Sequence, residues 1–206
     1  NLTRCRMPVG ANDFSTDWYS YDETPGDLSL DDFSIEHDHA TLVPFIQAAQ
    51  RHQPDLTLWA SPWSPPTWMK TNGHYAAAKA SSLAAGVDNG IRDDQLGAEG
   101  TDMMRLDDDT LAAYAAYFGR FVDAYAELGI PITMVMPQNE FNSAQIFPSC
   151  TWTPEGLAAF VRHLGPEMRR RDVDVYLGTL ERADDGLVER VLADETAAGY
   201  ISGIGA

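Results

Sequence analysis

Four groups of polar and aromatic residues each follow a short apolar run, and together they offer acid–base groups, amides and flat aromatic faces. In chain order they are Asn12 and Asp13; Ser61, Trp63 and Trp68; Gln138, Asn139 and Glu140; and Glu181 and Arg182. The loops that follow the strands of a parallel α/β sheet lie at one end of the sheet, where such proteins bind ligands. If the apolar runs are parallel strands, these residues line one site.

Glu140 is the first candidate for a catalytic group. Partial burial at the end of the apolar run 132–136 would raise the pKa of its carboxyl, which suits a general acid that protonates a leaving oxygen. Asn139 would then bind an adjacent hydroxyl of the substrate. A solvated surface carboxylate is the common alternative for an isolated Glu, but the hydrophobic strand before it and the neighbouring Trp63 and Asp13 loops favour the catalytic interpretation.

Three further side chains have two interpretations each. Trp63 and Trp68 have flat faces on which a sugar ring can stack, and the alternative, stronger for Trp68, is packing beneath a long loop. Asp13 can accept hydrogen bonds from two hydroxyls or can cap its own turn. Arg6 lies within an apolar run, where an unpaired charge is costly. We therefore expect it to meet a carboxylate, with Glu140 as one candidate, or to orient a catalytic group.

Strand-like and helix-like patterns alternate along the chain. Extended apolar runs predict strands at 3–9, 56–60, 132–136, 173–179 and 201–206, and helical spacing predicts helices at 37–51, 109–128, 154–171 and 185–197. Right-handed crossovers between parallel strands allow a doubly wound sheet or part of a (β/α)8 barrel. The sequence contains neither GxGxxG nor GxxxxGK[ST], the phosphate-binding turns of doubly wound nucleotide-binding folds, which favours the barrel.

Two other stretches have local meaning. Residues 71–108, rich in Ala, Gly and Asp, interrupt the alternation and are expected to form a long excursion of the kind that is often functional. The acidic tracts 107–109 and 184–185 precede predicted helices, where the helix dipole favours negative charge.

The composition excludes several classes of ligand. The 206 residues carry 14 Lys and Arg against 31 Asp and Glu, a net charge of −17, so nucleic acid and anionic membranes are poor partners and a neutral substrate is expected. No run approaches the roughly 18 apolar residues of a membrane helix, so we expect a soluble protein, secreted or cytoplasmic. The spacing of the five histidines predicts no metal site, and no cofactor is expected. Cys5 and Cys150 do not by themselves predict a disulfide, and the oligomeric state stays open.

Several motifs resemble those of glycoside hydrolase family 30, retaining glycosidases that include glucosylceramidase and β-1,6-glucanases. They are RMPVGANDFS (6–15), ASPWSPPTWMKTNG (60–73), PQNE (137–140) and FPSCTWTPE (147–155). The resemblance implies an α/β fold, a (β/α)8 TIM barrel of which residues 1–206 supply roughly strands 2 to 6, without the β-sandwich domain of whole family proteins. It also implies hydrolysis of a neutral β-glycoside, such as a β-glucoside, glucosylceramide or β-1,6-glucan, by double displacement.

The same resemblance implies roles for individual residues. It matches Glu140 to the acid/base, Asn139 to the residue that holds the 2-hydroxyl, Asp13 and Trp63 to the terminal sugar subsite, and Arg6 to a strand arginine near the catalytic carboxylates. Phe141 stands where the family commonly has proline.

The resemblance also points to a missing group. Retaining glycosidases need a second carboxylate, the nucleophile, about 5–5.5 Å from the first. The resemblance places this Glu at the end of barrel strand seven, beyond Ala206, and leaves Glu181 with at most a substrate-contacting role. We therefore expect the isolated chain to be inactive. The alternative is a carbohydrate-binding or inactive barrel fragment in which Trp63 and Asp13 hold sugar and no nucleophile exists.

Overall fold

Residues 2–83 and 86–205 are described by the computed structural model, and they contain one sheet of five parallel strands. The strands are β1 (Arg4–Pro8), β2 (Thr57–Ser61), β3 (Ile132–Val135), β4 (Asp174–Leu177) and β5 (Ile201–Ile204). Each strand pairs in parallel with the next one along the chain. A doubly wound sheet reverses its strand order at a switch point, whereas consecutive order is that of a (β/α) barrel. The predicted parallel α/β arrangement is confirmed.

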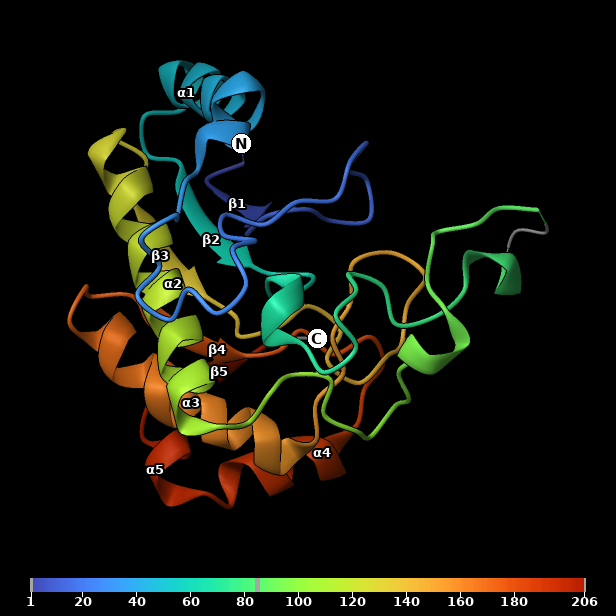
Figure 1. Ribbon diagram of the computed structural model, residues 1–206. Coiled ribbons are helices and arrows are strands. Elements are labelled where there is room, and N and C mark those ends of the chain that lie inside the picture. Colours follow the sequence, from blue (N-terminus) through green and yellow to red (C-terminus); the bar gives the residue numbers. More distant parts are fainter. Residues whose placement is uncertain (1, 84–85, 206) are drawn as a thin grey trace.

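Helices connect the strands on one side of the sheet. They are α1 (Leu42–His52), α2 (Asp108–Glu127), α3 (Pro154–Arg169), α4 (Asp185–Leu192) and α5 (Glu195–Ala198), with short 3-10 helices at Glu36–Ala40, Thr67–Met69, Ala80–Ser82 and Asp93–Gln95. Figure 1 shows the α-helices around the outside of the sheet, while the loops that leave the strands, including the long green segment before α2, extend away from them. The predicted excursion at 71–108 is therefore observed, and α2 begins at its last residue.

Side chains that accept hydrogen bonds from backbone N–H groups mark the start of three helices. Asp107 caps α2, Thr153 caps α3 and Asp184 caps α4, through bonds to the N–H groups of Thr110 (3.0 Å), Gly156 (2.9 Å) and Leu187 (3.1 Å). These side chains satisfy donors that have no partner within the helix. Both acidic tracts thus lie at helix N-termini, as predicted.

Several predicted elements have other bounds in the structure, and three of these differences change an element's type, number or extent. The predicted helix at 37–51 begins as α-helix only at Leu42, because Glu36–Ala40 is a 3-10 helix. The predicted helix at 185–197 is two helices, because the Asp194 side chain accepts the Ala197 N–H (2.9 Å) and starts α5. The predicted strand at 201–206 ends at Ile204, and its last residue, 206, lies outside the described residues.

Aromatic side chains fill the contact between α2 and α3. Tyr114 and Phe118 of α2 lie 4.8 and 5.8 Å from Phe160 of α3, measured between ring centroids, and Trp152 stacks on Phe160 at 5.5 Å. All four side chains are buried. Burying a large apolar side chain contributes roughly 1.5–3 kcal/mol, so this cluster is a major part of the core that supports the sheet.

A buried carboxylate holds the loop after β1 against α2. Asp38 is fully buried and accepts hydrogen bonds from the hydroxyls of Tyr19 (2.6 Å), Tyr21 (2.6 Å) and Tyr125 (2.5 Å). Two of the tyrosines belong to the loop and the third to α2. Because a buried carboxylate is stable only when it is hydrogen-bonded, this arrangement fixes the course of the loop that carries Asp13.

A buried ammonium joins three other loops. Lys70 donates to the Ser64 hydroxyl (3.1 Å) and to the carbonyls of His74 (2.5 Å), Tyr75 (2.8 Å) and Ser149 (2.7 Å). These acceptors come from the loop after β2, from the excursion and from the loop after β3. Burial lowers the pKa of Lys70 to about 8, because the charged form loses its hydration.

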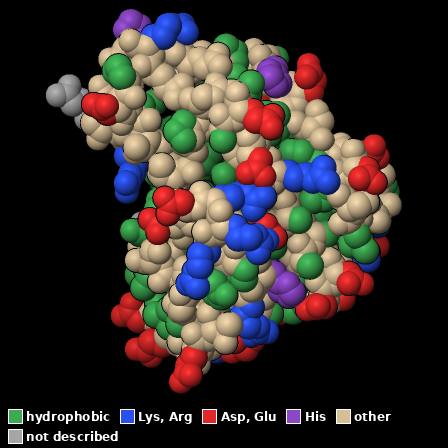
Figure 2. All heavy atoms as spheres, turned by 90° about the vertical axis from the view of Figure 1, so that its left-hand side faces the viewer, with side chains coloured by type: hydrophobic (Ala, Val, Ile, Leu, Met, Phe, Trp, Pro, Cys, Tyr) green, Lys and Arg blue, Asp and Glu red, His purple; other side chains and the backbone are tan. Residues whose placement is uncertain are grey.

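The outer, helix-bearing surface carries charges of both signs despite the net charge of −17. Figure 2 shows Lys and Arg side chains interleaved with Asp and Glu on this side. Arg171, two residues after α3, pairs with Asp123 (2.8 Å) and Glu167 (2.7 Å). Among the helices described here, none has the length and apolar character needed to cross a membrane.

Candidate active site

The carboxyl ends of β1, β2 and β3 bring together an arginine, a serine, a tryptophan and an amide. Arg6 of β1 donates from Nη2 to Ser61 Oγ (2.7 Å) and to Asn139 Oδ1 (2.5 Å). Its guanidinium carbon lies 4.2 Å from the ring centroid of Trp63 and 4.9 Å from that of Trp59. Planar guanidinium groups stack favourably on aromatic faces, so the two rings and two oxygens hold Arg6 in one orientation.

Arg6 lies in β1, within the predicted strand at 3–9, and its hydrogen-bond partners are a hydroxyl and an amide. Its side chain is solvent-accessible, and Asn139 rather than Glu140 is its direct partner. Glu140 and Asp13 act on it through space: burial lowers the pKa of Arg6, and these two carboxylates oppose that shift. Arg6 therefore holds the side chain of Asn139, the neighbour of Glu140.

The two residues before Glu140, Gln138 and Asn139, both have buried amide side chains. Gln138 donates from Nε2 to the carbonyls of Trp63 (2.7 Å) and Asn139 (2.8 Å). The backbone N–H of Asn139 donates to the Pro62 carbonyl (2.8 Å), and its side-chain Oδ1 accepts from Arg6 and from the Thr179 hydroxyl (3.0 Å). The turn after β3 is thereby bonded to the loop after β2 and to the residue after Gly178.

Glu140 occupies an unusual backbone conformation at the centre of these contacts. Its φ is 49°, in the left-handed region that non-glycine residues seldom adopt, and its N–H donates to Thr179 Oγ1 (3.1 Å). Its carboxyl is half-buried, and the described residues offer no hydrogen-bond partner to Oε2. Phe141, which stands where the family commonly has proline, is fully buried in the core.

Burial and like charges both act on the Glu140 carboxyl. Burial is the largest cause that raises its pKa, followed by repulsion from Glu181 and Asp13, while Arg6 and Gln145 oppose the rise. A raised pKa keeps a carboxyl protonated at higher pH, which is the state a general acid requires.

The two tryptophans and Asp13 have different surroundings. Trp63 is 8% exposed and stacks on Arg6. Trp68 donates from Nε1 to the Asp22 carbonyl (3.1 Å) and packs against the core, the packing alternative for this residue. Asp13 is exposed, and its turn is capped by Asn12, whose Oδ1 accepts the Phe14 N–H (2.9 Å). Local capping therefore does not occupy the Asp13 carboxylate.

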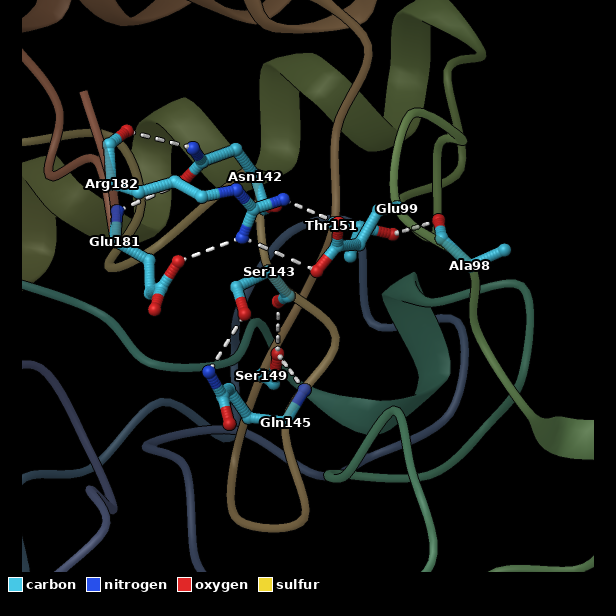
Figure 3. A network of polar contacts seen from close by, with 9 residues as sticks. All are labelled: Ala98, Glu99, Asn142, Ser143, Gln145, Ser149, Thr151, Glu181 and Arg182. Carbon is cyan, nitrogen blue, oxygen red and sulfur yellow. Dashed lines mark hydrogen bonds and ion pairs between the residues drawn. The ribbon is translucent and has the colours of Figure 1, made fainter. Parts of the chain in front are cut away.

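Glu181, whose charge acts on Glu140, belongs to the polar network shown in Figure 3. Its N–H donates to Asn142 Oδ1 (2.9 Å), and its exposed carboxylate pairs with Arg182 (2.7 Å). Arg182 also donates to the Asn142 carbonyl (3.2 Å) and pairs with Glu99 of the excursion. Figure 3 shows Arg182 between Glu181 and Glu99, so the excursion is tied to the turn that carries Glu140.

Thr179, Asn142 and Glu99 are site residues that the sequence patterns missed. Thr179 was assigned to the end of a predicted strand, whereas β4 ends at Leu177 and the Thr179 hydroxyl is used in the site. The sequence could have pointed to Thr179, because it is a polar residue close after an apolar run, as Asn139 and Glu140 are.

Residues that could hold a metal ion are scattered. In the ranges 2–83 and 86–205, no group of three His, Cys, Asp or Glu side chains is arranged to bind one. Within the same ranges Cys5 and Cys150 are both free, and burial raises the pKa of the Cys150 thiol to about 12.

Consecutive parallel strands, outer helices and a polar site at the carboxyl ends of the strands define part of a (β/α) barrel. The chain belongs to glycoside hydrolase family 30: the sequence profile of the glycosyl hydrolase family 30 TIM-barrel domain matches residues 1–206.

The chain is also similar to individual proteins. Lysosomal acid glucosylceramidase of Mus musculus is 33% identical over 211 residues, which cover 97% of this chain and 36% of that protein. Endo-1,6-beta-D-glucanase of Neurospora crassa is 26% identical over 99% of this chain and 39% of its own length. The crystal structure of SrfJ from Salmonella typhimurium superimposes with a TM-score of 0.76 at 29% identity, covering 98% of this chain and 41% of that one. The chain thus spans well under half the length of these relatives.

Proposed function

We propose that residues 1–206 are roughly strands 2 to 6 of the catalytic barrel of a retaining β-glycosidase that hydrolyses a neutral β-glycoside. The observation that carries the proposal is the half-buried Glu140 carboxyl, with an unbonded Oε2, next to an Asn139 amide held by Arg6. Such a pair can protonate a leaving oxygen while binding the neighbouring hydroxyl of the same sugar.

The mechanism has two displacement steps. In the first, Glu140 donates its proton to the departing glycosidic oxygen while a carboxylate nucleophile attacks the anomeric carbon and forms a glycosyl-enzyme ester. In the second, the Glu140 carboxylate takes a proton from water, which attacks the anomeric carbon and releases the sugar and the nucleophile. We propose that the nucleophile is a Glu encoded after residue 206, and that the complete gene product also carries a β-sandwich domain.

The substrate-binding side chains support a neutral sugar. Trp63, 8% exposed with Arg6 stacked on its ring, would contribute apolar surface to the sugar site, and the exposed Asp13 carboxylate can accept hydrogen bonds from two hydroxyls. The mouse relative is a glucosylceramidase and the Neurospora relative an endo-1,6-beta-D-glucanase, and both names refer to a glucose-containing substrate. We therefore propose a β-glucosyl unit, attached either to a lipid as in glucosylceramide or to another sugar as in β-1,6-glucan.

Leaving-group dependence tests the role of Glu140. In the complete gene product, Glu140→Gln should lower kcat/KM for an alkyl β-glucoside by about 100-fold or more, because general acid catalysis contributes roughly 10²–10⁴-fold. A dinitrophenyl β-glucoside, whose leaving group needs no proton, should lose far less in the first step. Initial rates on both substrates measure the difference.

The control is Glu127→Gln at the exposed end of α2, which should change neither rate. Equal losses on both substrates would show that Glu140 has another role. A wild-type gene product that binds sugars and hydrolyses no glycoside would instead support a carbohydrate-binding or inactive barrel.

A further inference from the structure

The hydroxyl of Thr179 lies between the two residues on which the proposed reaction depends. It donates to Asn139 Oδ1 (3.0 Å) and accepts the backbone N–H of Glu140 (3.1 Å). A hydroxyl has one proton and two acceptor lone pairs, so it can form both bonds at once. Thr179 comes from the loop after β4, and it therefore links that loop to the turn after β3.

The first consequence is a fixed orientation of the Asn139 amide. Its Oδ1 accepts from Arg6 Nη2 (2.5 Å) and from Thr179, so both acceptor lone pairs are used. Flipping the amide would place Nδ2 against the Arg6 donor and would take away the acceptor of the Thr179 hydroxyl proton. The Nδ2 group is consequently left as a donor on the remaining side, where the 2-hydroxyl of a bound glycoside would accept its hydrogen bond.

The second consequence concerns the direction of Glu140. Its left-handed φ of 49° is costly for a residue with a Cβ and persists only when the surroundings hold it. The N–H of Glu140 is held by Thr179, and its carbonyl accepts the Ser143 N–H (2.9 Å). The hydroxyl of Thr179 thus accepts one of the two backbone hydrogen bonds of Glu140 that keep the acid/base turn in this conformation.

We propose that Thr179 is a positioning residue for glycoside hydrolysis, whose single hydroxyl orients the Asn139 amide toward the substrate 2-hydroxyl and holds the Glu140 turn. The inference rests on the proposed function. It predicts that the enzyme recognises the 2-hydroxyl of its substrate through Thr179, a residue that would not itself touch the sugar.

Two variants of the complete gene product separate this role from simple packing. Thr179→Val removes the hydroxyl at nearly constant shape, and kcat/KM for an aryl β-glucoside should fall about 10- to 100-fold, the range expected when catalytic groups are displaced by about 1 Å. Thr179→Ser keeps the hydroxyl and should stay within about threefold of the wild type. Thr133→Val, which removes a hydroxyl bonded to the Leu58 carbonyl within the sheet, is the matched control and should leave the rate unchanged.

The substrate supplies the decisive comparison. With an aryl 2-deoxy-β-glucoside, Asn139 has no hydroxyl to bind, so Thr179→Val should cost at least threefold less than it does with the parent glucoside. Equal losses on the two substrates, or loss of activity in Thr179→Ser, would overturn the proposed action through Asn139. If Thr179→Val unfolds at the assay temperature, Thr179→Ala carries the same comparison.

The outcomes also separate the two proposals. A wild-type protein that hydrolyses no glycoside overturns the proposed function and this inference with it. Wild-type turnover together with an unaffected Thr179→Val variant overturns the inference alone.

Discussion

At the scale of single residues, the carboxyl of Glu140 is the group whose state depends most on its neighbours. Burial and the negative charges of Glu181 and Asp13 raise its pKa, and Arg6 acts in the opposite direction. Removing one of these charges should therefore shift the protonation of Glu140 without removing any proposed reacting group.

Glu181→Gln tests this dependence. Loss of the negative charge reduces repulsion, so the pKa of Glu140 falls, and the proton needed for acid catalysis is lost at lower pH. The alkaline limb of the pH profile of kcat/KM should move to lower pH, as measured on an aryl β-glucoside with the complete gene product.

The matched control for Glu181→Gln is Glu155→Gln, because Glu155 also pairs with an arginine, Arg190 (2.8 Å), and is not among the charges that act on Glu140. Its profile should coincide with that of the wild type. An alkaline limb that stays in place in Glu181→Gln would mean that Glu181 does not influence the acid.

At the scale of elements, long loops rather than strands hold most of the site, and buried polar side chains hold the loops. Lys70 joins three of them through four hydrogen bonds. Replacing it by methionine would leave buried carbonyl groups unpaired, at a cost of about 1–3 kcal/mol for each unsatisfied group.

Lys70→Met should therefore lower the thermal midpoint of unfolding, and the amount should depend on pH. The pKa of Lys70 is about 8 in the folded protein against 10.5 when unperturbed, so between these values the unfolded chain binds more protons. The contribution of Lys70 to folding stability is then constant below pH 8 and rises as the pH rises from 8 to 10.5.

Thermal unfolding of wild type and Lys70→Met at pH 7, 8, 9 and 10 measures this difference, which should widen above pH 8. Lys79→Met is the control, since the only other lysine of the sequence is solvent-accessible and pairs with Asp93. A difference between wild type and Lys70→Met that narrows with rising pH would contradict the lowered pKa.

The elements also show where sequence patterns succeed. All five strands and the helices between them were predicted in the right order, because apolar periodicity is a local property that burial on a sheet or helix imposes. The ends were less accurate. Asp194 divides the last predicted helix because it caps a new one, and a capping side chain resembles any other exposed Asp in the sequence.

At the scale of the whole molecule, β1 and β5 are the two edges of the sheet. Eight strands close a barrel of this family's type, and an open strand edge presents unpaired N–H and carbonyl groups to other chains. Residues 1–206 produced alone should aggregate or fail to hydrolyse aryl β-glucosides. Size-exclusion chromatography and an activity assay test this, and turnover by the purified, monomeric 206-residue chain would contradict it.

The sequence by itself was sufficient for the strand and helix order and the candidate residues Glu140, Asn139 and Trp63, because those depend on apolar spacing and on polar residues that follow strands. Only the tertiary structure showed that Arg6 holds Asn139 rather than Glu140, and that Thr179 bonds both members of the pair. These contacts join residues that are 39 to 133 positions apart. Hydrogen bonds of this kind depend on the register and twist of neighbouring strands, which no local pattern encodes.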